Sequence, residues 1–375
     1  MSWLNRMGSG LLLAVVVCAS HAVEVENMYE VQLPVTDQNQ DSRQAAFELG
    51  FVEVLVRVSG TSTLPAKPGQ ASSFVQQYRY VPVEQSETAV PPKVGDVVIT
   101  HNLWLRFDEA AIKKLLRSNG LPVWGTQRPA VLVWLAVRDG PSRYILGGQD
   151  ISPIRDAVVA EGVRRGLPLI WPAYDEKDSQ RVAFTDVWGG FFDQVTQASQ
   201  RYAPSAVLIG RMDWQKKGGW QINWSLLEDG KQQVGKQRNW QQRSTELPVL
   251  MAAGINPVAD LLAGRFAVVE NPSGVVSLTL QVNGVTGAEA YSQVERYLQS
   301  LALVKQVFAT TISSGRAQFR LDINGGEEDL RRTIALERIL APEATPESAI
   351  VAPDSASTTA PKVVPPVLRY RLNPS

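Results

Sequence analysis

Side chains that could act as a nucleophile, a general base or a soft metal ligand are few in this chain. The sequence holds one cysteine, Cys18, and two histidines, His21 and His101. His101 lies in the run Val97 to Phe107, where apolar residues alternate, and it falls on their face. We therefore interpret it as a core histidine rather than a general base. No Gly-x-Ser-x-Gly motif accompanies it, which argues against a serine triad.

The remaining chemical motifs are equally sparse. Two carboxylates suffice for glycoside hydrolysis, but the sequence does not single out a pair. It contains neither a Gly-x-Gly-x-x-Gly motif nor a phosphate-binding loop with its Lys-Ser/Thr. Cys18 and His21 fall in the expected leader, which argues against a Cys/His zinc site in the rest of the chain. The sequence therefore predicts no catalytic, cofactor-binding or metal-ligating residue.

Aromatic side chains give the best indication of a binding surface. Four tryptophans lie around two expected hairpins, among Lys, Gln, Asn and Arg side chains: Trp214, Trp220, Trp224 and Trp240. Indoles beside amides suit a sugar or the edge of a partner protein. Apolar residues also alternate from Trp220 to Leu226, as they would on a strand that packs against a core. An exposed binding face and a buried core both remain open.

Residues 1–22 have the pattern of a secretory signal peptide. Arg6 precedes an apolar run from Leu11 to Ala19, and Ser20 and Ala22 are small residues at the positions that a signal peptidase reads. Cleavage after Ala22 predicts a periplasmic protein. A lipid anchor on Cys18 is the alternative, although Val17 stands where such sites have a small residue.

Composition limits the classes of partner. The chain has 37 Lys+Arg and 37 Asp+Glu, and this balance argues against a nucleic-acid partner. Its 44% hydrophobic residues suffice for buried cores. After the leader, we expect no segment long and apolar enough to span a membrane. The oligomeric state is open.

Breaks in composition and patterning divide the chain into three small domains and a tail. We expect α/β and α+β sandwiches built on mixed sheets. The expected units are a signal peptide (1–22), an α+β domain (23–127), an α/β domain with antiparallel hairpins (128–270), a ferredoxin-like βαββα domain (275–340), and a flexible tail (341–375). Within the tail, Val367 to Leu372 alternates like a strand that docks onto a domain.

Local signals predict where helices begin and break. The expected N-terminal caps are Asp41, in a capping box with Gln44, Asp108, Ser152, and Thr286 in a capping box. Glu53 and Arg57 are four residues apart, in the order that favours an ion pair on a helix. A helical region over 246–266 is expected to break at Asn256-Pro257.

Several short motifs resemble a family of uncharacterised secreted Gram-negative proteins. They are the runs 120–125 (Gly-Leu-Pro-Val-Trp-Gly), 128–129 (Arg-Pro), 131–135 (Val-Leu-Val-Trp-Leu) and 207–211 (Val-Leu-Ile-Gly-Arg). The family is the domain of unknown function numbered twenty sixty-six. The middle domain is also similar to the amino-terminal domain of the Tol-Pal propeller protein. These resemblances imply a role in the cell envelope and carry no site residue.

The sequence thus favours a non-enzymatic periplasmic interaction or scaffold protein, with an envelope protein or a glycan as its partner. Two alternatives stay open. One is a carboxylate-dependent hydrolase of envelope glycan or peptidoglycan, and the other is a periplasmic protein that binds a small ligand or a glycan.

Overall fold

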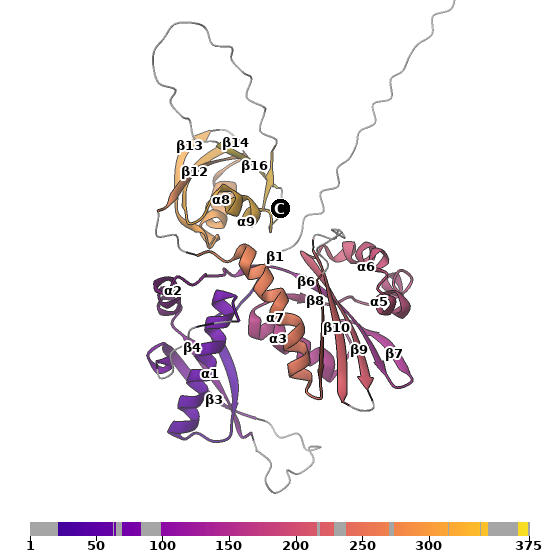
Figure 1. Cartoon of the computed structure of the whole chain (residues 1–375). Helices are drawn as coiled ribbons and strands as arrows, with labels where there is room; N and C mark the ends of the chain where they lie inside the picture. The colour runs from indigo at the N-terminus through magenta and orange to yellow at the C-terminus, as the bar shows by residue number, and fades with distance from the viewer. Residues whose placement is uncertain are drawn as a thin grey trace, which may run out of the picture.

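The structure is a computed structural model with mixed α/β architecture in three units (Figure 1). It describes residues 22–62, 64, 70–83, 99–215, 218–228, 238–269, 274–313, 315–337, 339–343 and 367–373. The predicted leader, up to residue 21, and residues 344–366 of the predicted flexible tail lie outside the described residues.

The first unit is a small antiparallel sheet packed against helices. Its strands, in the order β2-β4-β3, are β2 (Glu30–Val35), β4 (His101–Phe107) and β3 (Val75–Pro82). Its helices are α1 (Gln40–Ser59), η1 (Ala71–Ser73) and α2 (Glu109–Ser118). Alternate strand residues such as Leu103 and Leu105 are fully buried in a core shared with Phe47 and Phe51 of α1. This core fixes the direction in which α1 points.

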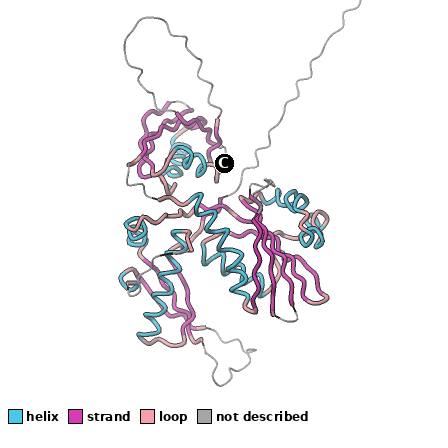
Figure 2. The backbone as a smooth tube through the Cα atoms, viewed as in Figure 1, coloured by secondary structure: helices cyan, strands magenta, loops and turns pink. Residues whose placement is uncertain are grey.

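The second unit has helices on both faces of one sheet (Figures 1 and 2). The sheet order is β11-β10-β9-β6-β7, with β8 also paired to β6: β6 (Val131–Asp139), β7 (Ser142–Leu146), β8 (Leu169–Ile170), β9 (Ala206–Gln215), β10 (Gly219–Glu228), β11 (Arg238–Ser244). Helices α3 (Pro153–Arg165) and α7 (Leu247–Phe266) cover one face of the sheet. Helices α5 (Phe184–Gly189) and α6 (Phe192–Ser199) cover the other face, and two short helices adjoin them: α4 (Glu176–Ser179) before α5 and η2 (Gln200–Tyr202) after α6.

Strand β6 shows why the sequence folds into this three-layer arrangement. Val131, Val133 and Leu135 join the core beneath α3 and α7, whereas Leu132 and Trp134 join the core beneath α5 and α6. Both faces of the strand are therefore buried. A central strand of this kind requires the nearly continuous apolar run that the sequence shows.

The third unit is a five-stranded sheet with two helices, in the sheet order β13-β14-β12-β16-β15. Its elements are β12 (Val276–Val285), α8 (Ala288–Ser300), β13 (Val304–Ser313), β14 (Gly315–Ile323), α9 (Glu327–Ile334), β15 (Leu340–Pro342) and β16 (Val367–Leu372). The βαββα order expected from the sequence is present. Strand β16 pairs in parallel with β12, so the C-terminal segment lies inside the sheet, between β12 and β15.

Two further strands tie the units together. Strand β1 (Ala22–Glu24) pairs with β5 (Gln127–Pro129), which precedes the second unit. A β-bridge between Val123 and Val268 joins the end of the first unit to the segment that follows α7 and leads to the third unit. Figure 1 shows α3 and α7 lying between α1 and the large sheet, with the third unit at one end of α7.

Some expected helix signals are confirmed and others are wrong. Asp108 and Ser152 cap α2 and α3 as predicted. Asn39, not Asp41, caps α1 by accepting a hydrogen bond from the backbone N–H of Ser42. Helix α8 begins after Gly287 without a side-chain cap, so Thr286 does not have the expected role.

Helix α7 corrects two further expectations. It runs unbroken from Leu247 to Phe266 with Pro257 inside it. It is also 20 residues long with a mean hydropathy of 1.5, so one described segment beyond residue 22 is long and apolar enough to cross a membrane by length and composition. Residues along one side of α7, from Leu250 to Ala263, are buried in the core of the second unit. A core helix meets the same criterion of length and composition.

Candidate functional site

Helices α1 and α3 end at the same place, where the first and second units meet. Each ends at a glycine in the left-handed region, Gly60 with φ 75° and Gly166 with φ 59°. The last carbonyl groups of a helix have no partner within the helix and carry its negative dipole end. Because two such ends converge here, several buried carbonyl groups need hydrogen-bond donors from outside their own helices.

Arg128 of β5 provides several of these donors. Its side chain is fully buried and donates to five backbone carbonyls: Arg57 O at 2.7 Å, Trp124 O at 3.2 Å, Gly125 O at 3.0 Å, Arg165 O at 3.0 Å and Gly166 O at 2.8 Å. The guanidinium also stacks on the Trp124 ring, 4.0 Å from its centroid. Burial, and then the charge of Arg57, lower the pKa of Arg128. The two helix ends provide the compensating negative potential.

Arg57 of α1 forms hydrogen bonds with β2 of the first unit and with α3 of the second unit. It forms the predicted ion pair with Glu53, with 2.5 Å between Nη2 and Oε1. Its Nη1 donates to Glu30 O at 2.6 Å, and its Nε donates to Arg164 O of α3 at 3.3 Å. Burial lowers the pKa of Arg57 and raises the pKa of Glu53, so for each group desolvation outweighs the attraction of the pair.

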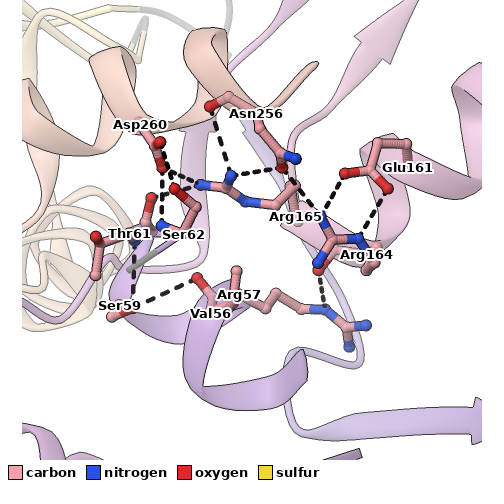
Figure 3. Close-up of polar contacts among 12 residues, drawn as sticks. Val56, Arg57, Ser59, Thr61, Ser62, Glu161, Arg164, Arg165, Asn256 and Asp260 are labelled. Carbon is pink, nitrogen blue, oxygen red and sulfur yellow. Dashed lines mark hydrogen bonds and ion pairs between the residues drawn. The ribbon is translucent and has the colours of Figure 1, made fainter. Parts of the chain in front are cut away.

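Arg165 connects α3 to both α1 and α7 (Figure 3). Its Nη2 donates to Gly60 O at 2.6 Å and to Asp260 Oδ1 at 2.7 Å, and its Nη1 donates to Asn256 Oδ1 at 2.7 Å. Asp260 also accepts from the backbone N–H and the hydroxyl of Ser62, at 3.0 and 2.7 Å. Arg165 therefore joins three helices at one point.

Arg164 completes the group on the outer side. Its guanidinium forms a two-point ion pair with Glu161, at 2.8 and 2.5 Å, and donates to Asn256 Oδ1 at 3.0 Å. The hydrogen bond to Glu161 raises the pKa of Arg164. We call Arg57, Arg128, Arg164 and Arg165 the arginine junction.

The arginine junction is a structural device rather than an anion site. Most of its guanidinium N–H groups donate to carbonyls or carboxylates of this chain. A side chain at Gly166 would overlap the guanidinium of Arg128, and one at Gly60 would overlap Ala263. The space is filled, so the junction holds the first and second units in a fixed relation.

An open groove of about 540 Å³ lies beside the arginine junction. Residues 23–27 form one wall, and the second half of α3 with β8 forms the other. Its lining is largely apolar and includes Val163, whose side chain is 64% exposed, and Trp171. Arg155 lies over the Trp171 ring, 5.6 Å from its centroid. An apolar groove with a few polar groups at a domain junction is typical of a binding site.

A second groove, of about 600 Å³, lies along the same N-terminal segment and is more polar. Its acidic lining residues include Glu24, Glu26, Glu30 and Asp108. Glu30 pairs with Arg106 and accepts from the indole N–H of Trp104. Asp108 caps α2 by accepting from Ala111 N. Two of the carboxylates are therefore occupied in holding the fold.

The four predicted tryptophans differ in their exposure. Trp224 is completely buried, and its ring lies between Gly210 of β9 and Gly254 of α7 with no room for a side chain on either. Trp240 is partly buried against the same core. These two tryptophans follow the core-packing interpretation.

Trp214 and Trp220 lie nearer the tip of the β9-β10 hairpin. They are cross-strand partners, with ring centroids 5.1 Å apart and an edge-to-face arrangement. Trp214 is 43% exposed, whereas Trp220 packs partly against the core. Only this end of the predicted aromatic surface is open to a partner.

Trp240 explains why α7 tolerates a proline in its middle. Pro257 has no N–H, so the carbonyl of Ala253, one turn earlier, lacks its usual helical donor. The indole N–H of Trp240 donates to that carbonyl at 2.7 Å. A side chain from β11 thus replaces the missing backbone hydrogen bond, and the helix continues.

His101 lies at the start of β4 and is only partly buried, so the expectation of a core histidine holds in part. Its Nε2 is 2.9 Å from Gln38 Nε2, and its Nδ1 is 2.9 Å from Thr100 Oγ1. Neither contact provides the carboxylate of a catalytic triad. Among the described residues, no group of three or more His, Cys, Asp or Glu side chains is placed to hold a metal ion.

Sequence reasoning missed the arginine junction. It predicted the Glu53–Arg57 ion pair within one helix but not the contacts of Arg57 to other segments, and it treated Arg128 only as part of a motif. The available signal was positional: Arg57, Arg164 and Arg165 all lie in the last turns of helices that end in glycine. Basic residues there complement the helix dipole.

Residues 22–125 match a family described as Domain of unknown function (DUF8605). The family number expected from the sequence, twenty sixty-six, is not confirmed. No curated protein matches this chain.

Two solved structures are weakly similar to the chain. One is TolB from Acinetobacter baumannii, at 12% identity and a TM-score of 0.23, over 44% of this chain and 35% of that one. The other is protein XCC0632 from Xanthomonas campestris, of family DUF330, at 14% identity and a TM-score of 0.12, over 38% of this chain and 86% of that one. This chain therefore spans about a third of the TolB structure, and neither TM-score assigns a shared fold.

Proposed function

We propose that this protein is a non-enzymatic interaction protein of the periplasm that binds an extended apolar segment of a partner protein in the groove beside the arginine junction. The groove is the observation that carries the proposal. Its lining is largely apolar, and its walls come from the first and second units, which hydrogen bonds hold together. Walls held in a fixed relation reduce the ordering cost of binding. The export signal expected over residues 1–22 supports a periplasmic partner.

Site-specific photo-crosslinking in intact cells tests this proposal. A photoreactive amino acid replaces Val163, which is 64% exposed inside the groove. The matched control replaces Leu49, which is 65% exposed on α1 and does not line the groove. We expect a discrete crosslinked partner from position 163 and none from position 49. Equal crosslinking at both positions, or none at position 163, contradicts the proposal.

The second candidate function is a carboxylate-dependent hydrolase of envelope glycan, and the acidic groove is the observation that favours it. Glu24 and Glu26 line that groove beside carboxylates already engaged in structural contacts. Incubation of the purified protein with peptidoglycan fragments, followed by mass spectrometry, separates the two functions. Released products that disappear in a Glu24→Gln/Glu26→Gln variant favour the hydrolase, and unchanged fragments favour the interaction protein.

A further inference from the structure

The sheet of the third unit is completed by a strand that arrives from far along the chain. Strand β12 opens this unit and β16 closes it, yet the two lie side by side (Figure 1). Residues 344–366 join β15 to β16. Strand β16 therefore enters a slot whose two walls, β12 and β15, are formed by earlier parts of the chain.

The contacts of β16 in the slot are specific. Residues 367–371 pair in parallel with residues 279–283 of β12, and residues 370–372 pair with β15. Leu368 and Tyr370 are 1% and 2% exposed and belong to the core of the third unit. Outside the core, Arg371 pairs with Glu343, with 2.7 Å between Nε and Oε1. Backbone pairing, two apolar anchors and one ion pair fix a single register.

All of these contacts come from a six-residue segment, Val367–Leu372. A second copy of the chain carries the same segment, so it can make the same hydrogen bonds, fill the same core positions and form the same ion pair. A connection as long as residues 344–366 spans at most about 80 Å, which is enough to reach a neighbouring molecule. Exchange of an identical element between copies creates no new contact and loses none.

We propose that the slot between β12 and β15 is a strand-exchange site, in which the β16 segment of a second copy replaces the chain's own β16 and joins the two copies. In an intramolecular competition of this kind, the chain's own strand acts at an effective concentration on the order of 1 mM. Exchange is therefore a minor state in dilute solution. It becomes substantial where the protein is concentrated.

Disulfide trapping between two full-length variants tests the proposal. Both carry Cys18→Ser, which removes the only cysteine of the sequence. One copy carries Gln281→Cys and the other, with a distinguishable tag, carries Arg369→Cys. Gln281 and Arg369 are register partners on neighbouring strands, and such residues lie at a separation that a disulfide can bridge.

The two variants are mixed, brought to exchange equilibrium by partial unfolding and refolding, and oxidised. We expect a disulfide-linked pair of differently tagged copies in about one chain in ten at about 100 µM protein, and about tenfold fewer at about 10 µM. The matched control pairs Arg369→Cys with Thr310→Cys, an exposed position on β13. We expect crosslinking of the control pair to be severalfold lower at both concentrations.

A double variant with Gln281→Cys and Arg369→Cys in one chain provides the second measurement. Its intrachain disulfide locks β16 in its own slot, so light scattering should show a monomer across the same concentrations. Failure of this intrachain disulfide to form contradicts the register, and therefore the proposal. If the intrachain disulfide forms but the mixed variants crosslink no more than the control pair, the exchange site is refuted. Neither result bears on the groove beside the arginine junction.

Discussion

At the scale of single residues, Arg128 determines how the first two units meet. A buried cation is costly unless hydrogen bonds and an opposing potential compensate for the lost water. Arg128 obtains both from five backbone carbonyls, which come from the ends of α1 and α3 and from the segment before β5. Lysine lacks the planar fork that allows one side chain to serve so many acceptors.

We expect Arg128→Lys to lower the free energy of unfolding by about 3 kcal/mol, because several buried carbonyls lose their donor. Urea denaturation followed by tryptophan fluorescence measures the change. The matched control is Arg143→Lys, at an exposed position of strand β7, where we expect a change within about 0.5 kcal/mol. If Arg128→Lys also changes the free energy of unfolding by no more than about 0.5 kcal/mol, the positive charge of Arg128 is sufficient and its guanidinium geometry is not required.

At the scale of elements, the C-terminal end of α3 depends on a glycine for two separate reasons. Gly166 has φ 59°, which other residues rarely adopt, and a Cβ at this position would lie 2.5 Å from Arg128 Nη1 and 2.8 Å from Arg57 Cγ. Gly140, in the turn between β6 and β7, has nearly the same φ of 58°, but a Cβ there would meet no other atom within 4 Å. Comparison of substitutions at Gly140 and Gly166 therefore separates the cost of backbone strain from the cost of steric overlap.

We expect Gly140→Ala to cost about 1 kcal/mol, the backbone cost alone. Gly166→Ala should cost about 2 kcal/mol more, because the new methyl group displaces the guanidinium of Arg128. Denaturation of both variants under the same conditions measures the difference. Equal costs would mean that the arginine junction adjusts freely to an added methyl group, and would contradict its role in holding the first and second units in a fixed relation.

Helix α7 provides a second test at the element scale. Trp240→Phe removes the indole N–H that replaces the hydrogen bond lost at Pro257, so it should cost about 1–2 kcal/mol. In a Pro257→Ala background, residue 257 regains an N–H for the Ala253 carbonyl, and Trp240→Phe should then cost about 1 kcal/mol less. A double-mutant cycle measures this coupling. A coupling of zero would contradict the assigned role of Trp240.

At the scale of the whole molecule, the N-terminal strand and the third unit are coupled by charge. Burial, and then the nearby charge of Glu24 on β1, raise the pKa of Glu337, after α9, to about 7. Its Oε1 is buried without a hydrogen-bond partner in the described structure. Because the folded pKa lies above the unfolded value, folding favours the protonated form. The stability that Glu337 contributes is therefore present below about pH 4.5 and is lost as pH rises through about 7.

We expect Glu337→Gln to be more stable than the native protein by about 1–2 kcal/mol at pH 8, with allowance for solvent screening, and nearly unchanged at pH 4. Denaturation at both pH values measures the effect. The matched control is Glu328→Gln, an exposed carboxyl in the first turn of α9. Loss of its favourable interaction with the helix dipole should lower the stability slightly at pH 8, which is opposite in sign to the effect of Glu337→Gln. A gain from Glu337→Gln that is the same at both pH values would point to a cause other than ionisation.

The sequence alone determined the features that depend on neighbours along the chain. These are the mixed α/β class, the continuous apolar run of β6, the caps of α2 and α3, and the Glu53–Arg57 pair, because periodicity and spacing decide which residues share a face. The tertiary structure alone decided what covers each face. It buried Trp224 but left Trp214 exposed, placed Trp240 against the carbonyl freed by Pro257, and brought two helix ends around Arg128. Burial and hydrogen bonding of these groups depend on residues distant in the sequence, and a local pattern cannot specify them.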